Sequence, residues 1–124
     1  MSEALSGAVP KLVGGFPAVP TTKVLVVARL HSPLTQEQRK SIMPREVPAT
    51  VRLHLTGKID QWWSRQDGKG PVFLLNVTSL EEAREIVDSL PLHEEGLMEC
   101  DLIELGPLRP LHLLLREDRA DSMA

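Results

Sequence analysis

The stretch Lys23-Val-Leu-Val-Val-Ala-Arg-Leu-His31 decides the fold of this chain. Its β-branched residues favour a strand, and its length suits one strand of a sheet. Both of its faces are largely apolar, which is typical of a central strand covered on two sides. Because side chains alternate along a strand, Arg29 and His31 share one face, which also carries Leu25 and Val27. We therefore predict a central strand over residues 23–31.

Helix signals follow this strand. Thr35 can cap a helix, and Gln38 three residues later completes a capping box. Pro44 fits the first turn of a second helix, where its missing N–H has no partner to lose. Residues 49–57, which end at a plausible capping glycine, fit either a strand or a helix. The alternation of Val51, Leu53 and Leu55 favours a strand. The four-residue spacing of Val47, Val51 and Leu55 favours a helix.

The second half of the chain repeats the strand and helix signals. Residues 59–65 and 71–77 indicate two strands of a hairpin, joined by a glycine-rich turn. Ser79 caps a clearly amphipathic helix that Pro91 ends. Residues 97–105 indicate a last strand. The order is β-α-β-β-α-β, which predicts an α+β domain with a four-stranded antiparallel sheet and two helices on one face.

The predicted sheet is too apolar for one face to meet water. A second copy of the chain packed on that face would bury its apolar side chains, so we expect a homodimer or higher homo-oligomer. The apolar tail Leu111–Leu115 can add a further strand, for example on a partner's sheet.

Length and composition limit the possible functions. The 124 residues suit one domain, which we place at 23–116 between a flexible arm (1–22) and a frayed C-terminus (117–124). A net charge of −3 and only four aromatic residues argue against nucleic-acid binding. Cys100 is the only cysteine, which excludes an internal disulfide. We find no signal peptide or membrane span and expect a cytoplasmic protein.

Several short motifs give the chain a resemblance to a known family. These are Glu46 with Arg52-Leu53 after it, Trp63 in the second strand, and Asn76-Val-Thr-Ser-Leu-Glu-Glu-Ala83 leading into Ser89-Leu-Pro-Leu92. Over about residues 23–106 the chain resembles the muconolactone isomerase-like members of the dimeric α/β-barrel superfamily. The resemblance implies a ferredoxin-like fold, a dimeric barrel and a helix over the ambiguous residues 49–57.

The resemblance also implies a site. In this family a small acidic or polycyclic substrate binds between sheet and helices, and a proton is transferred without a cofactor. Glu46 matches a family carboxylate proposed to shuttle the proton, and Arg52 matches a basic position nearby. The hairpin histidine of the family is absent, since the aligned stretch reads Gln61-Trp-Trp-Ser-Arg-Gln-Asp-Gly68.

We therefore take Glu46, Arg52 and His54 as candidate catalytic residues. A carboxylate facing an apolar pocket has its pKa raised by desolvation, as a general base needs. The alternative for Glu46 is a solvated glutamate in the first turn of a helix, and for His54 an exposed helix position. The candidate substrate-binding residues are Arg29, His31, Trp63 and Arg65. The four histidines lie on separate elements, so we expect no metal site.

Three functions fit these residues. The first is a cofactor-independent isomerase, cyclase or lyase that acts on a small oxygenated metabolite, anionic or derived from an aromatic compound. The second is a non-catalytic protein that binds a small molecule on the same fold. The third, weaker, is a cofactorless monooxygenase. None of the three requires nucleic acid or a membrane as a partner.

The arm of residues 1–22 should be dispensable for folding, because its three prolines and three glycines come without apolar periodicity. Its deletion should lower the melting temperature by no more than a few degrees, which corresponds to about 1 kcal/mol in a domain this small. Thermal unfolding of the truncated chain measures this, and a larger drop would mean that the arm is packed.

Overall fold

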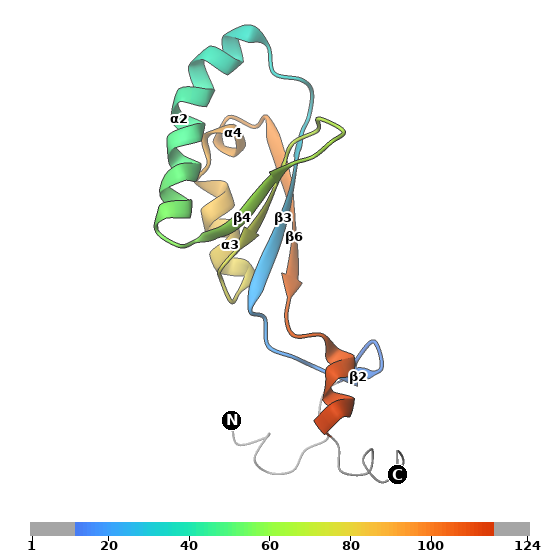
Figure 1. Ribbon diagram of the computed structural model, residues 1–124. Coiled ribbons are helices and arrows are strands. Elements are labelled where there is room, and N and C mark those ends of the chain that lie inside the picture. Colours follow the sequence, from blue (N-terminus) through green and yellow to red (C-terminus); the bar gives the residue numbers. More distant parts are fainter. Residues whose placement is uncertain (1–11, 116–124) are drawn as a thin grey trace. The chain divides into compact units, whose positions relative to one another are not determined.

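The computed structural model describes residues 12–115, without the side chains of residues 112 and 113. The chain divides into two compact units (Figure 1). The larger is Thr21–Leu105, and the described part of the smaller comprises residues 12–20 and 106–115. The predicted frayed C-terminus at 117–124, and the part of the arm before residue 12, lie outside the described residues.

A four-stranded sheet forms the larger unit. Its strands are β3 (Lys23–Leu30), β4 (Ile59–Ser64), β5 (Pro71–Leu75) and β6 (Met98–Leu105). They lie in the order β4-β5-β3-β6, and every neighbouring pair is antiparallel. The α+β class and the antiparallel sheet are therefore confirmed, and the arrangement is compatible with a ferredoxin-like fold.

The helices of this unit lie on one face of the sheet (Figure 1). They are α2 (Gln36–Leu55), α3 (Leu80–Asp88) and the single turn α4 (Pro91–Glu94). Ser79 caps α3 through a hydrogen bond from Glu82 N–H, as its sequence predicts. Pro91 does end the α3 segment, but it is also the first residue of α4, a position that suits proline. The sequence had predicted only the end of a helix at Pro91.

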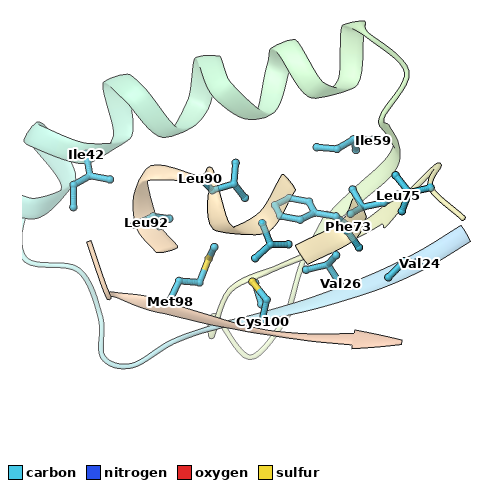
Figure 2. Close-up of a cluster of buried hydrophobic side chains, with 14 residues drawn as sticks. Val24, Val26, Ile42, Ile59, Phe73, Leu75, Leu90, Leu92, Met98 and Cys100 are labelled. Atoms are coloured by element: carbon cyan, nitrogen blue, oxygen red, sulfur yellow. The ribbon is translucent and has the colours of Figure 1, made fainter. Parts of the chain in front are cut away.

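Alternation along β3 separates the two faces of the sheet. Val24, Val26 and Ala28 are completely buried beneath the helices. Val24 pairs with Leu75, and Val26 lies between Phe73 and Leu102 in the neighbouring strands. These side chains join those of the helices in one hydrophobic core, shown in Figure 2.

The opposite face of the sheet, which we call the outer face, is apolar over its centre and carries the charged Arg29, Glu99 and Asp101 toward one end. It carries the half-buried residues Leu25, Val27, Val72 and Leu74 and the exposed Ile103. Within the described part of the larger unit no helix packs on it (Figure 1). The central strand is thus apolar on both sides, but only one side is covered by the unit itself.

Helix α2 corrects one expectation. The capping box of Thr35 and Gln38 is confirmed, and residues 49–55 are helical, but Pro44 does not start a second helix. Both Pro44 and Pro48 lie inside one helix of 20 residues. At about 100° per residue, each lies about 200° from Glu46, on the side opposite the core. The carbonyls that lose their N–H donors belong to Lys40 and Pro44, which are exposed, so water can reach them.

The smaller unit contains two elements that the sequence did not predict. Within the region predicted to be a flexible arm, β1 (Leu12–Val13) and β2 (Phe16–Pro17) form a small hairpin. Gly14 and Gly15 make its turn with φ of +60° and +84°, values that glycine adopts without strain. The tail predicted to add a strand is instead the 3₁₀ helix η1 (Arg109–Leu115). Pro110, with its fixed φ, favours such a turn over a strand.

Two threonines define where the arm joins the sheet. Thr21 Oγ1 donates to Glu104 Oε2 at 2.7 Å, and Thr22 N–H donates to Leu105 O at 2.8 Å. Both residues therefore belong to the larger unit, which begins at Thr21. A deletion that ends at Pro20 tests the arm without removing these hydrogen bonds.

Candidate functional site

Glu46 is a buried carboxylate on the core side of α2, with 5% of its surface exposed. Its Oε1 accepts a hydrogen bond of 2.9 Å from Leu92 N–H in α4. This is its only hydrogen bond among the described residues. Desolvation raises the pKa of the Glu46 carboxyl above its ordinary value, and the hydrogen bond from Leu92 opposes this more weakly. The alternative of a solvated first-turn glutamate therefore does not describe Glu46.

The carboxylate lines a cavity of about 360 Å³ between α2 and the sheet, which we call the Glu46 cavity. Its walls are mostly apolar, and its few polar side chains are Glu46, Thr50, Ser64 and Arg65. The main apolar lining residues are Leu30, Leu34, Met43, Val47, Phe73 and Leu92. An apolar cavity with a few converging polar groups is the usual form of a small-molecule site.

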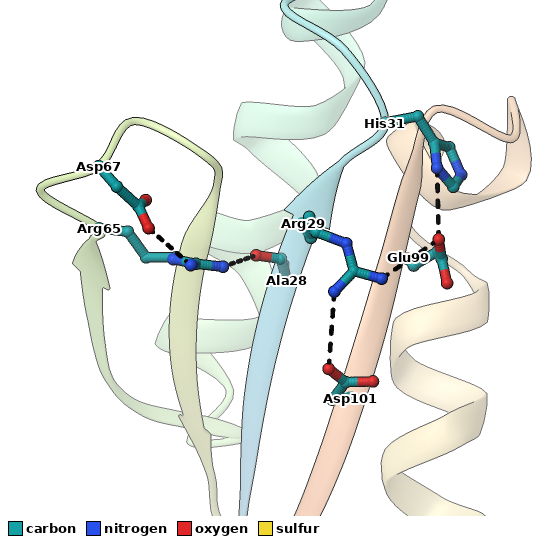
Figure 3. A network of polar contacts seen from close by, with 7 residues as sticks. All are labelled: Ala28, Arg29, His31, Arg65, Asp67, Glu99 and Asp101. Carbon is teal, nitrogen blue, oxygen red and sulfur yellow. Dashed lines mark hydrogen bonds and ion pairs between the residues drawn. The ribbon is translucent and has the colours of Figure 1, made fainter.

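Arg65 is the cationic residue of this cavity. Its Nη2 donates to Asp67 Oδ2 at 2.7 Å, and its Nη1 donates to Ala28 O at 3.4 Å (Figure 3). Lys69 N–H donates to Asp67 as well, and this bond, together with Arg65, holds the pKa of the Asp67 carboxyl below its ordinary value. The guanidinium is thus fixed between the hairpin and β3 and is only partly exposed.

Gly70 allows the hairpin to approach β3 this closely. Its φ is +152°, and a Cβ at this position would lie 2.6 Å from Ala28 O. Any side chain there would push the hairpin, and with it Arg65, away from the central strand. Leu30 N–H completes the attachment by donating to Lys69 O at 2.8 Å.

The other two candidate catalytic residues lie elsewhere. Arg52 is exposed, and neither it nor His54 lines the Glu46 cavity. His54 Nδ1 lies 3.0 Å from Ile59 O, and its ring stacks on Trp62 with 4.9 Å between the ring centroids. These contacts connect the end of α2 to β4, and His54 itself is exposed, as the alternative for this residue expected.

Arg29 and His31 lie with the outer face, as alternation predicts. Arg29 forms ion pairs with Glu99 at 3.3 Å and Asp101 at 3.9 Å, and His31 Nδ1 lies 3.3 Å from Glu99 (Figure 3). Both line a separate cavity of about 440 Å³ beside the hairpin. Of the four candidate substrate-binding residues, only Arg65 lines the same cavity as Glu46.

Trp63 and its neighbour Trp62 lie at the edge of the sheet, on β4. They line a further cavity of about 360 Å³, which we call the tryptophan cavity. Sequence reasoning missed Thr50 and Ser64, which line both this cavity and the Glu46 cavity. The position of Thr50, one helical turn after Glu46, was a usable signal. Ser64 offered none, because its place depends on the pairing of β4 with β5.

The remaining features that could indicate a function are the single cysteine, possible metal ligands and possible membrane-spanning helices. Cys100 is buried, and desolvation raises the pKa of its thiol to about 11, so the thiol stays protonated at neutral pH. Among the described residues no group of His, Cys, Asp and Glu side chains could hold a metal ion. Of the described helices, none has the length and apolar character to cross a membrane.

No protein-family model matches this chain, and no curated protein matches it either.

Replacing Glu46 with glutamine should stabilise the fold at neutral pH. In the unfolded chain the Glu46 carboxyl loses its proton near its ordinary pKa of 4.5, whereas in the folded chain burial delays this loss to higher pH. The free energy of unfolding therefore falls as the pH rises from about 4.5 through the folded pKa. Glutamine has no charge to bury, so it avoids this loss of stability, and its side-chain oxygen still accepts from Leu92 N–H.

We expect Glu46→Gln to raise the melting temperature by a few degrees at pH 7 and by less at pH 4. Thermal unfolding across this range measures the difference, with Glu85→Gln, an exposed position on α3, as the control for net charge. A difference between Glu46→Gln and the unaltered chain that does not change with pH would contradict the role of burial.

Proposed function

We propose that this protein is a cofactor-independent enzyme that transfers a proton within a small oxygenated anion. The reaction class is that of an isomerase, a cyclase or a lyase, and the site is the Glu46 cavity. One observation carries the proposal: a buried carboxylate with a raised pKa opens onto an apolar cavity that also holds an arginine. A general base works best when its pKa approaches the working pH, and burial shifts Glu46 in that direction.

The proposed reaction uses few groups. The ionised Glu46 carboxylate accepts a proton from a carbon next to a carbonyl or carboxylate group of the substrate. The electron pair of that C–H bond moves onto the carbonyl oxygen and forms an enolate, whose charge the Arg65 guanidinium stabilises. Ser64 supplies a hydroxyl donor to a substrate oxygen, whereas the Thr50 hydroxyl already donates to Val47 O at 2.9 Å. The protonated Glu46 then returns its proton to another carbon, which completes an isomerisation.

We also infer that the chain forms a dimeric α/β barrel of the muconolactone isomerase-like kind. The apolar outer face, uncovered within the described part of its unit, supports this, because a second sheet packed there would bury both faces. The single cysteine, reduced and buried, suits a cytoplasmic protein.

A specific observation favours a second candidate, a non-catalytic binding protein. Leu92 N–H already occupies one oxygen of Glu46, and no histidine lines the described cavity to assist a proton transfer. Arg52 and His54, which the resemblance placed with Glu46, are not part of it. In this alternative Glu46 only selects ligands that donate a hydrogen bond.

The test between the two is proton exchange. ¹H NMR in D₂O follows deuterium entering the carbon next to the carbonyl in a panel of small keto acids and unsaturated lactone carboxylates. Glu46→Gln should slow exchange by on the order of 10²–10⁴ with little change in affinity, since the amide still fills the cavity. Glu85→Gln should exchange as the unaltered protein does. Binding without exchange would favour the binding protein, and unchanged exchange in Glu46→Gln would remove Glu46 from the mechanism.

The dimer is tested by light scattering at micromolar concentration, where the mass should be twice the 13.8 kDa of one chain. Ile103→Lys on the outer face should give monomers, because a charge cannot be buried there unpaired. Leu80→Lys is the matched control, since Leu80 is similarly exposed, at 41% against 47% for Ile103, but lies on α3. A monomeric unaltered chain would contradict the proposal.

A further inference from the structure

Strand β6 has one unpaired edge in the described structure. It lies at the end of the sheet, and β3 is the only described strand that pairs with it. His31 N–H donates to Leu97 O at 3.1 Å, which fixes the alternation of hydrogen bonds between the two strands. In the register that continues from this pair, the backbone N–H and C=O groups of Glu99, Asp101 and Ile103 point to β3.

The alternate residues of β6 direct their backbone groups to the free edge. They are Met98, Cys100, Leu102 and Glu104, which we call the edge row. Within the part of the chain that the structure describes, their backbone groups have no partner on that side. An unpaired strand edge of this length is a template for a further strand.

A cavity of about 670 Å³ opens beside this edge, between β6 and α3, and we call it the β6 groove. Cys100 and Leu102, two members of the edge row, line it from the strand, and Leu80 lines it from the helix. Figure 3 shows this helix alongside the strand. Because side chains alternate along a strand, a segment paired with the edge row would place every second side chain in the groove.

The β6 groove carries net negative charge. Three carboxylates line it, among them those of Glu81 and Asp101, against one cation, Arg84. Among the described residues Glu81 forms no ion pair. The Asp101 carboxylate lies 3.9 Å from Arg29, and its side chain is 71% exposed. The chain itself therefore neutralises these charges only weakly.

This charge argues against a second copy of the chain as the occupant of the edge. Two β6 strands paired with each other would bring Glu99, Asp101 and Glu104 of one copy close to those of the other. Like charges opposite each other destabilise a strand pair. A segment with basic side chains has the opposite effect, because its charges complement those of the strand and the groove.

We propose that β6 binds an extended basic segment of another protein, which adds to the sheet as a fifth strand. The backbone of the segment pairs with the edge row. Its apolar side chains, at alternate positions, lie in the groove against Leu80 and Leu102, and lysine or arginine side chains between them lie near the carboxylates. The β6 groove shares no lining residue with the Glu46 cavity, so this proposal does not depend on the proposed function.

A synthetic peptide of alternating apolar and basic residues, Val-Lys-Val-Arg-Val-Lys-Val, tests the charge. Calorimetric titration of the full chain should show saturable binding. A twin peptide with glutamate at the three basic positions should bind more weakly by on the order of tenfold or more. Binding of the basic peptide should also weaken as salt is added, because salt screens exposed charges. Absence of binding, or equal binding of the twin, would overturn the proposal.

N-methylation of the peptide tests the backbone pairing. In a strand, the N–H groups of successive residues point to opposite sides, so methyl groups on the valines and on the basic residues block different edges. One of the two methylated peptides should lose binding, and the other should bind as the parent does. Loss with the methylated valines indicates antiparallel addition to the edge row, and loss with the methylated basic residues indicates parallel addition. Equal affinities of the two would contradict strand addition.

A charge reversal locates the peptide on the protein. Glu81→Lys should weaken binding of the basic peptide by about five- to tenfold, because it replaces an attraction with a repulsion. Glu37→Lys is the matched control, since Glu37 is also an exposed glutamate in the first turn of a helix, but lies on α2. It should leave the affinity within about twofold. Equal losses in the two variants would mean that the peptide does not bind at the β6 groove.

Light scattering separates this partner from a second copy of the chain. The basic peptide should leave the number of chains in the assembly unchanged, because the edge is free before the peptide binds. If the peptide instead halves the mass, the edge is a contact between copies of the chain and the proposal is wrong.

Discussion

The hydrogen bond from Leu92 N–H to the Glu46 carboxylate is the contact on which the site depends. It joins α2 to α4 across 46 residues of sequence and lies among the side chains of the core. A buried carboxylate without a donor would cost several times more than one with a donor, so α4 must be where it is for Glu46 to be buried. The donor is a backbone group, and of the common substitutions at residue 92 only proline removes it.

The elements of the larger unit could largely be predicted from local pattern. The alternating buried residues of β3, the caps at Thr35 and Ser79 and the glycine-rich hairpin each have a mechanism confined to a few residues. Helix α2 was harder, because Pro44 and Pro48 argue against a continuous helix unless their side of it is known to face water. That knowledge comes from the packing of Ile42 and Glu46 against the sheet, which no local pattern shows.

The candidate site could be predicted only in part for the same reason. Glu46 is buried and lines a cavity, as the sequence suggested, and its role as a general base stays a prediction. Arg52, six residues on, is rotated by about 240° around the helix, and His54 lies on the order of 12 Å further along its axis. Neither can accompany Glu46 into one cavity. Arg65, the residue just after β4, reaches it through the antiparallel pairing of β4 and β5, and spacing in the sequence does not show such contacts.

The irregular pairing at the start of β4 has a consequence for solubility. β4 is an edge strand that carries two exposed tryptophans, a combination that invites pairing with the edges of other molecules. The pairing of β4 with β5 is irregular between Ile59 and Gln61, and Asp60 at that point carries a charge, which pairs with Lys23 at 3.6 Å. β6, the other edge, carries the acidic residues Glu99, Asp101 and Glu104. Both edges thus resist growth of the sheet into aggregates, while its apolar surfaces stay available for specific contacts.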